Sequence, residues 1–264
     1  MTDGPERARH GRTHDRDKPV ETLASRALNK LALMKAEARV KIEDRLAEML
    51  RAAVLSNNPA DRDNAITALR ESGCPDEAIV DTYIPHVARL LGEDWCRDDI
   101  GFADTSIGAS RLQSLLRDLT PDPRSVVGSA TDMSGVAVVV LSDDNHTLGA
   151  MVLTHQLRRM GVSVRVLVGA PADEALKEIV SDRYDAVFIS SSRTETLGKL
   201  KKFIESVKRQ TRQEIPVVLG GRVIEFLNDV RAEAGADYAT SSAEEAVRLC
   251  GLIARKHASS RSKT

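Results

Sequence analysis

The fold is decided by residues 135–149, which read GVAVVVLSDDNHTLG. The apolar run Gly135–Leu141 is rich in valine and has no polar interruption, as is typical of a strand buried on both faces of a parallel sheet. A polar segment follows the run, and apolar residues at helical spacing then extend from Leu148 to Met160. These residues predict a strand, a loop and a helix in succession.

Toward the C-terminus the same alternation is repeated. Further apolar runs predict strands at Val162–Val168, Ala186–Ser190, Pro216–Leu219 and, more briefly, Ala236–Ala239. Helical patterns separate or follow these runs at Ala172–Ser181, Thr194–Thr211, Ile224–Ala234 and Ala243 to about Ala254. Alternation at this pitch predicts a doubly wound, flavodoxin- or Rossmann-like parallel sheet over residues 135–264.

The N-terminal half carries helical patterns only. Residues 1–18 are charged and poor in aliphatic side chains, so we expect a flexible tail, and residues 121–134 are the expected linker. Residues 19–120 then form a helical bundle, and the fold class is α + α/β. The helical patterns run from Val20 to about Asn57, from Asn58 to Ser72, from Pro75 to Gly92 with a possible kink at Pro85, and from about Phe102 to Leu119.

Composition excludes several classes of protein. The chain has thirty-eight Lys and Arg and thirty-nine Asp and Glu, which leave a net charge of -1. Its net charge therefore provides no electrostatic attraction to nucleic acid or to an anionic membrane. Three scattered cysteines do not make a disulfide framework or a thiolate zinc site. No apolar run approaches the roughly 20 residues that cross a bilayer, and the polar N-terminus is no signal peptide. We therefore expect a cytoplasmic protein.

Polar side chains and glycines follow successive strands at the edge where ligands bind in such sheets. The first strand leads into Asp144-x-His146-x-x-Gly149, in which the imidazole can bind a metal and the carboxylate can accept its other ring proton. The third strand ends in Ser190, Ser191, Ser192, Arg193 and Thr194, and the fourth in Gly220 and Gly221, which leave a slot without side chains. The alternative for the first loop is that Asp143 or Asp144 caps the helix and His146 is merely exposed.

A phosphoacceptor receiver domain shares this fold and also has acidic residues after its first strand. Asp143 and Asp144 fit that interpretation. A receiver also needs an aspartate at the end of the third strand and a lysine after the last one, where this chain has Ser190 and Ala239-Thr240. The receiver interpretation is therefore disfavoured.

The spacing of these segments resembles that of the cobalamin-binding domain of methionine synthase, the carbon-skeleton mutases and the B12 photoreceptors. The resemblance implies that His146 replaces the dimethylbenzimidazole base as the lower cobalt ligand, with Asp144 as its hydrogen-bond partner. One departure is Ser192, where the family usually has leucine, and it makes the slot for the displaced nucleotide tail more polar. The implied cofactor-binding residues beside His146 and Asp144 are Thr147, Gly149, Ser190, Ser192, Thr194, Gly220 and Gly221.

The segment from Trp95 to Gln113 resembles a narrower group, the AerR- and PpaA-type antirepressors of photosynthesis genes, through Trp95, Phe102 and the Thr-x-x-Gly-x-x-Arg-Leu-Gln pattern. The resemblance implies that Trp95 and the helical bundle cover the free face of a corrin, although a lone tryptophan can also be core filler. It implies hydroxo-, methyl- or adenosylcobalamin as ligand, with haem as a lesser possibility. Asp104-Thr105 stands where the B12 photoreceptor repressors have Glu-His, so this segment supplies no upper histidine ligand. His86 on the preceding helix is a less favoured substitute, and we expect it to be structural.

Three functions follow from this resemblance. A mutase or methionine synthase needs a barrel domain that 264 residues cannot hold beside these two modules. A corrinoid methyl carrier of a methyltransferase system has this length, and a haem-binding redox sensor has this architecture. The favoured function is a light- or ligand-responsive regulator without enzyme activity, which binds a transcriptional repressor of photosynthesis genes. No basic helix-turn-helix is visible, so we expect no direct DNA binding, and nothing in the sequence sets the oligomeric state.

Overall fold

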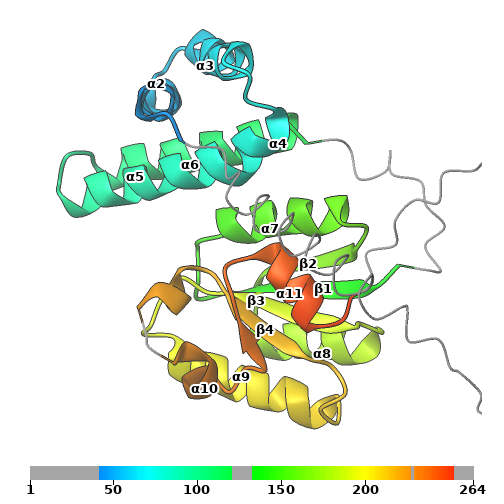
Figure 1. The fold of residues 1–264 in the computed structure, drawn as a ribbon. Coiled ribbons are helices and arrows are strands. Elements are labelled where there is room, and N and C mark those ends of the chain that lie inside the picture. The colour runs from blue at the N-terminus through cyan, green and yellow to red at the C-terminus, as the bar shows by residue number, and fades with distance from the viewer. Residues whose placement is uncertain (1–41, 121–132, 227–228, 253–264) are drawn as a thin grey trace, which may run out of the picture. The chain divides into compact units, whose positions relative to one another are not determined.

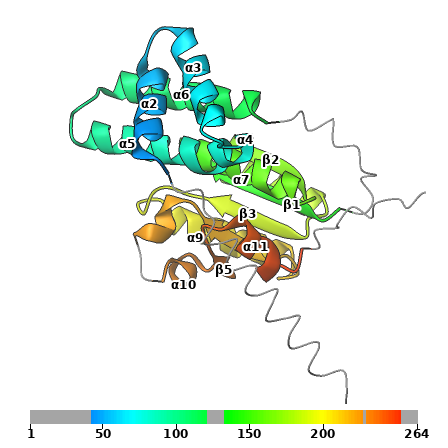
Figure 2. The same cartoon turned by 45° about the horizontal axis from the view of Figure 1, so that its top comes forward.

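The computed structural model describes residues 42–120, 133–226 and 229–252. The predicted tail 1–18, the helical pattern before residue 42 and most of the predicted linker lie outside these ranges. Helices fill the first range, as predicted. They are α2 (Asp44–Leu55), α3 (Pro59–Glu71), the short α4 (Asp76–Ala78), a π-helical turn η1 (Ile79–Tyr83), α5 (Ile84–Cys96) and α6 (Phe102–Asp118). Figure 2 shows α2 and α3 crossing α5 and α6.

Two backbone features of the helical part follow from single residues. Gly73 ends α3 at φ +86°, and the amide of Cys74 bonds back to the carbonyl of Leu69, as a left-handed cap requires. Pro85 lies in the first turn of α5, immediately after the π-helical turn, so the expected kink takes the form of a widened turn. Proline has no N–H to donate and its ring crowds the preceding turn, which a wider turn relieves.

The sheet has five parallel strands in the order β2-β1-β3-β4-β5 (Figure 1). They are β1 (Gly135–Leu141), β2 (Ser163–Ala170), β3 (Ala186–Ser190), β4 (Val217–Gly220) and β5 (Tyr238–Ala239). The chain passes from β1 to β2 on one side and then returns to β3 on the other. The loops after β1 and β3 therefore flank the point at which ligands bind in sheets of this topology.

Helices cover both faces of this sheet. Helices α7 (Leu148–Arg159) and α11 (Ala243–Leu249) lie on one face, and α8 (Ala172–Ser181), α9 (Leu197–Gln210) and α10 (Val230–Ala234) lie on the other (Figure 1). Along β1 alternate side chains enter the two cores: Val136, Val138 and Val140 pack with α7 and α11, and Ala137 and Val139 with α8 and α9. This double burial explains the uninterrupted apolar run with which the domain begins.

Three sequence predictions about the sheet domain are wrong in detail. Strand β2 is not buried on both faces, because it lies at the edge of the sheet, and Val168 is exposed. The helix expected at Ile224–Ala234 is a 3-10 turn, η4 (Arg222–Glu225), followed by the separate α10. The fifth strand pairs over two residues only. Within the described ranges no helix has both the length and the apolar character to span a membrane.

Candidate functional site

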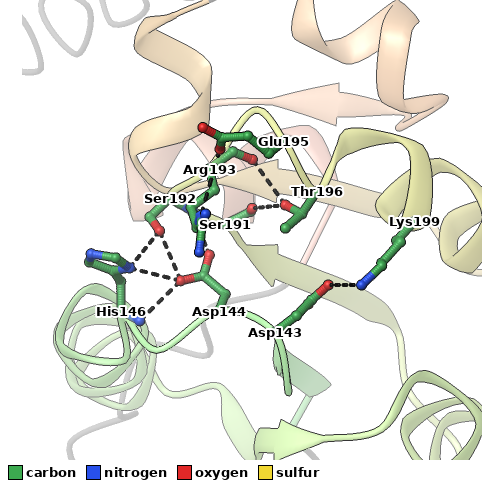
Figure 3. A network of polar contacts seen from close by, with 9 residues as sticks. All are labelled: Asp143, Asp144, His146, Ser191, Ser192, Arg193, Glu195, Thr196 and Lys199. Carbon is green, nitrogen blue, oxygen red and sulfur yellow. Dashed lines mark hydrogen bonds and ion pairs between the residues drawn. The ribbon is translucent and has the colours of Figure 1, made fainter.

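Asp144 is a buried carboxylate directly after β1, and it joins two loops. Its Oδ2 accepts a hydrogen bond from the backbone N–H of Ser192 at 2.6 Å, and its Oδ1 accepts one from the Ser192 hydroxyl at 2.8 Å. Oδ1 also accepts the backbone N–H of His146 at 3.0 Å and lies 3.0 Å from His146 Nδ1. Asp144 thus fixes the loop after β1 against the loop after β3 (Figure 3).

His146 is held by one ring nitrogen and leaves the other free. Its Nδ1 faces Asp144 and the Ser192 hydroxyl, which lies 2.7 Å away, and Figure 3 shows Nε2 turned away from both. The side chain is 68% exposed, whereas that of Asp144 is 4% exposed. A neutral imidazole that donates its Nδ1–H to a carboxylate has no proton on Nε2. The lone pair of Nε2 is then free to bind a metal.

The alternative that an aspartate caps α7 is wrong. The N-cap of α7 is Thr147, no side chain caps the helix, and the carboxylate of Asp143 instead pairs with Lys199 of α9 at 3.1 Å. The Thr147 hydroxyl accepts a hydrogen bond from Gln113 of α6 at 3.0 Å. A predicted cofactor-binding residue therefore contacts the helical part of the chain through Gln113, the last residue of the pattern that resembles the antirepressors.

Gly221 lies close to the backbone of the loop after β3, and its predicted place in the tail slot stays a prediction. Its φ is +87°, and a Cβ there would lie 2.3 Å from the carbonyl oxygen of Ser191. The space beside this glycine is thus filled by the backbone of the loop after β3, whose Ser191 also bonds to Gly220 and Val223. The sequence indicated the missing side chain at Gly221, but it did not indicate that Ser191 would occupy the space.

Among the described residues, only a small cavity lies between the loops after β1 and β3 at this edge of the sheet. A cavity of about 10 Å³, room for about one water molecule, lies under Asp143, Ser190 and Thr196. Thr194 has its carbonyl bonded to the amide of Leu197, at the turn before α9. That these residues line the slot for a nucleotide tail stays a prediction.

Two further predicted residues are Gly149, which has open space beside it, and Trp95, which is exposed. A Cβ on Gly149 would meet no atom within 4 Å, so a bulky group can approach the start of α7. Trp95 is 45% exposed and packs against the more exposed Phe102, with ring centroids 5.8 Å apart. Trp95 is therefore not core filler, and its contact with a corrin stays a prediction.

Sequence comparison identifies the domain. The family model "B12 binding domain" matches residues 134–250. A Rhodobacter capsulatus protein described as "Uncharacterized 20.5 kDa protein in bchF-crtJ intergenic region" is 35% identical over 191 residues, which are 70% of this chain and 96% of the relative. The chain belongs to the B12-binding domain family. The predicted resemblance to cobalamin-binding domains is thereby confirmed, and the receiver interpretation is wrong.

A solved structure supports the same fold for this B12-binding protein. The monomethylamine corrinoid protein of Methanosarcina barkeri is similar with a TM-score of 0.62 at 17% identity, over 79% of this chain and 98% of its own. A cobalamin-binding protein from Desulfitobacterium hafniense DCB-2 matches at a TM-score of 0.41 and 14% identity, over 80% of this chain and 98% of its own. The first likeness confirms the predicted fold class, a helical part followed by a parallel sheet.

The ionisation of Asp144 makes stability depend on pH. Burial by itself would raise the pKa of this carboxyl, but hydrogen bonds from His146 and Ser192 outweigh it and hold the pKa well below its usual range. A lowered native pKa stabilises the folded chain above the unfolded pKa of about 4, and the stabilisation is lost as the pH falls. We expect urea unfolding to show that Asp144→Asn costs on the order of 2 kcal/mol at neutral pH, with the difference shrinking toward pH 3. A difference that stayed constant with pH would contradict this account.

Proposed function

We propose that this B12-binding protein is a light- or ligand-responsive regulator without enzyme activity, which relieves the action of a repressor of photosynthesis genes. The observation that carries the proposal is the relative in the bchF-crtJ intergenic region, part of a photosynthesis gene cluster. The match covers 96% of that relative and 70% of this chain. The resemblance of residues 95–113 to antirepressors supports the same function.

The residues at the sheet edge fit a cobalt ligand. His146 offers an exposed ring with its Nδ1 already engaged, and Gly149 leaves open space next to it. His146 would hold the metal, Asp144 would fix its ring, and the loop after β3 would move to admit the tail. A bound cobalamin supplies a cobalt whose upper ligand can be exchanged or released by light. In the described ranges no cluster of three or more His, Cys, Asp or Glu residues could hold a metal ion, so the protein would supply the cobalt with a single ligand.

The helical part is placed to respond to a change at this site. The hydrogen bond from Gln113 to Thr147 connects α6 to the residue next to His146. A shift of the loop after β1 would therefore be passed to α6, whose N-terminal residue Phe102 packs on Trp95. Such a shift changes the surface of the helical part that a partner protein can bind.

The test is operator occupancy in the presence of a purified photosynthesis-gene repressor. We expect the cobalamin-loaded chain to release the repressor from its operator in one state, lit or dark, by at least tenfold more than in the other. The His146→Ala chain is the control and should act equally in both states. Unchanged occupancy with the loaded wild-type chain in light and dark would remove the antirepressor function.

The corrinoid methyl carrier is the second candidate, because the fold resembles that of a monomethylamine corrinoid protein. Transfer of a methyl group from the methylcobalamin-loaded chain to a thiol acceptor by a partner methyltransferase would favour this function. Loading with haem in place of cobalamin, followed by the absorption spectrum, separates the haem-binding sensor from both.

A further inference from the structure

We propose that Asp94 is a positioning residue for Trp95, and that it acts by fixing the turn between α5 and α6. Trp95 lies in the last turn of α5 and packs on Phe102, the first residue of α6. The inference deepens the proposed function and rests on it in one respect, that the chain binds cobalamin with Trp95 against the corrin.

Asp94 is a buried carboxylate with an arginine on each of its two oxygens. Its residue exposure is only 3%. Oδ2 accepts a hydrogen bond from Nε of Arg51 on α2 at 2.6 Å, and Oδ1 accepts one from a terminal guanidinium nitrogen of Arg97 at 2.6 Å. Asp94 thus connects α2 to the residue that directly follows α5.

The chain after α5 folds back onto Asp94. The amides of Arg97 and Asp99 donate to the backbone carbonyl of Asp94 at 3.2 and 2.9 Å, and Nε of Arg97 donates to the Asp99 carboxylate at 2.9 Å. Asp98 lies between them at φ +61°, a left-handed conformation that a residue with a Cβ adopts at a cost. Arg97, bonded to a carboxylate on either side, holds the chain in this conformation.

This turn sets the relative position of the two aromatic rings. Trp95 precedes the turn and Phe102 follows it, and their ring centroids lie 5.8 Å apart at an interplanar angle of 59°. Such a tilted packing is favourable for an aromatic pair. Because both side chains are exposed, contacts with the core constrain them little. The position of Trp95 therefore depends on the turn, and the turn depends on Asp94.

The contribution of Asp94 is to geometry more than to net stability. Removing an ion pair from water costs about as much free energy as the attraction between its charges returns, so a buried pair typically adds little stability. Two arginines from different segments nevertheless restrict the carboxylate, since each of its oxygens faces one guanidinium. A stability measurement alone would therefore not reveal the role of Asp94, and the test must observe Trp95.

Trp95 is the only tryptophan of the chain, so tryptophan fluorescence of the cofactor-free protein reports on this residue alone. We expect Asp94→Asn and Arg97→Gln to raise the acrylamide quenching constant about twofold and to weaken the tryptophan band in near-ultraviolet circular dichroism, because the ring pair separates. Arg97→Gln leaves the bond between Arg51 and Asp94 in place, so this variant decides the question if Asp94→Asn does not fold. The control is Glu48→Gln, which removes the exposed second partner of Arg51 and should leave both signals unchanged.

Wild-type quenching and circular dichroism in the folded Asp94 and Arg97 variants would overturn the inference, even if these variants were less stable. Cobalamin affinity is the second readout. We expect both variants to lose about two- to tenfold in affinity, because a ring that is free to move must be ordered on binding. Wild-type affinity in both, together with a loss in Trp95→Ala, would equally overturn the inference. Full affinity of Trp95→Ala would instead remove the contact with the corrin, and fluorescence would still decide the role of Asp94, so the two failures are distinguishable.

Discussion

His146→Ala is expected to reduce the affinity for cobalamin at least 100-fold and to change the visible absorption spectrum of whatever cobalamin still binds. His146 is the only histidine of the described residues that Asp144 and Ser192 orient, and its Nε2 faces away from both. If His146 holds the cobalt as proposed, its loss removes that ligand, and the spectrum should be that of a cobalamin with another ligand in its place. Titration of the purified chain with hydroxocobalamin, followed by absorption, gives both quantities.

A histidine outside the site serves as the control for this substitution. His86 lies on α5, outside the hydrogen-bond network of Asp144, His146 and Ser192, and His86→Ala should bind cobalamin with the wild-type spectrum. If His146→Ala and the wild-type chain gave the same spectrum and affinity, the lower ligand would not be this histidine.

Gly221→Ala is expected to lower the free energy of unfolding by about 3 kcal/mol or more. An alanine at φ +87° is strained by about 1–2 kcal/mol, and its Cβ would also lie 2.3 Å from the Ser191 carbonyl oxygen, which is backbone and has little freedom to yield. Urea unfolding of the cofactor-free chain, followed by circular dichroism, measures the change.

Gly198→Ala is the matched control, since a Cβ there meets nothing within 4 Å and Gly198 lies in the first turn of α9. Alanine in a helix is preferred to glycine, so this variant should be more stable than wild type by up to about 1 kcal/mol. Equal effects of the two substitutions would show that the contact between Gly221 and Ser191 does not constrain the fold.

The sequence was sufficient for the architecture because each element of the sheet domain carries its own pattern. The run Gly135–Leu141 is apolar on both faces, and the structure places alternate side chains of it in two cores. The same reasoning failed for β2, because Ser163 and Arg165 interrupt its apolar residues, and such alternation is typical of a strand that is only partly buried. The position of β2 at the edge of the sheet depends on which strands pair, and strand pairing joins segments that are distant in the chain. The local pattern of Val162–Val168 therefore does not predict it.

The candidate site was predictable as a set of residues but not as a network. Asp144 and His146 are two positions apart, so their contact follows from local geometry, and the structure has it. The contact of Ser192 with both comes from a loop 46 residues further along, and the direction of its hydroxyl depends on backbone angles that residue type does not set. A glycine can make room for a ligand or for neighbouring backbone, and the sequence alone does not distinguish the two. At Gly221 the structure shows neighbouring backbone, that of Ser191.

The double attachment of Asp144 bears on protein engineering. Its two oxygens bond to the backbone and hydroxyl of Ser192, so the orientation of the histidine is a joint property of two chain segments. Transplanting the segment Asp144–Gly149 alone onto another parallel sheet would leave the carboxylate without half of its partners. A graft designed to capture a metal should therefore carry residues 190–193 together with the histidine loop.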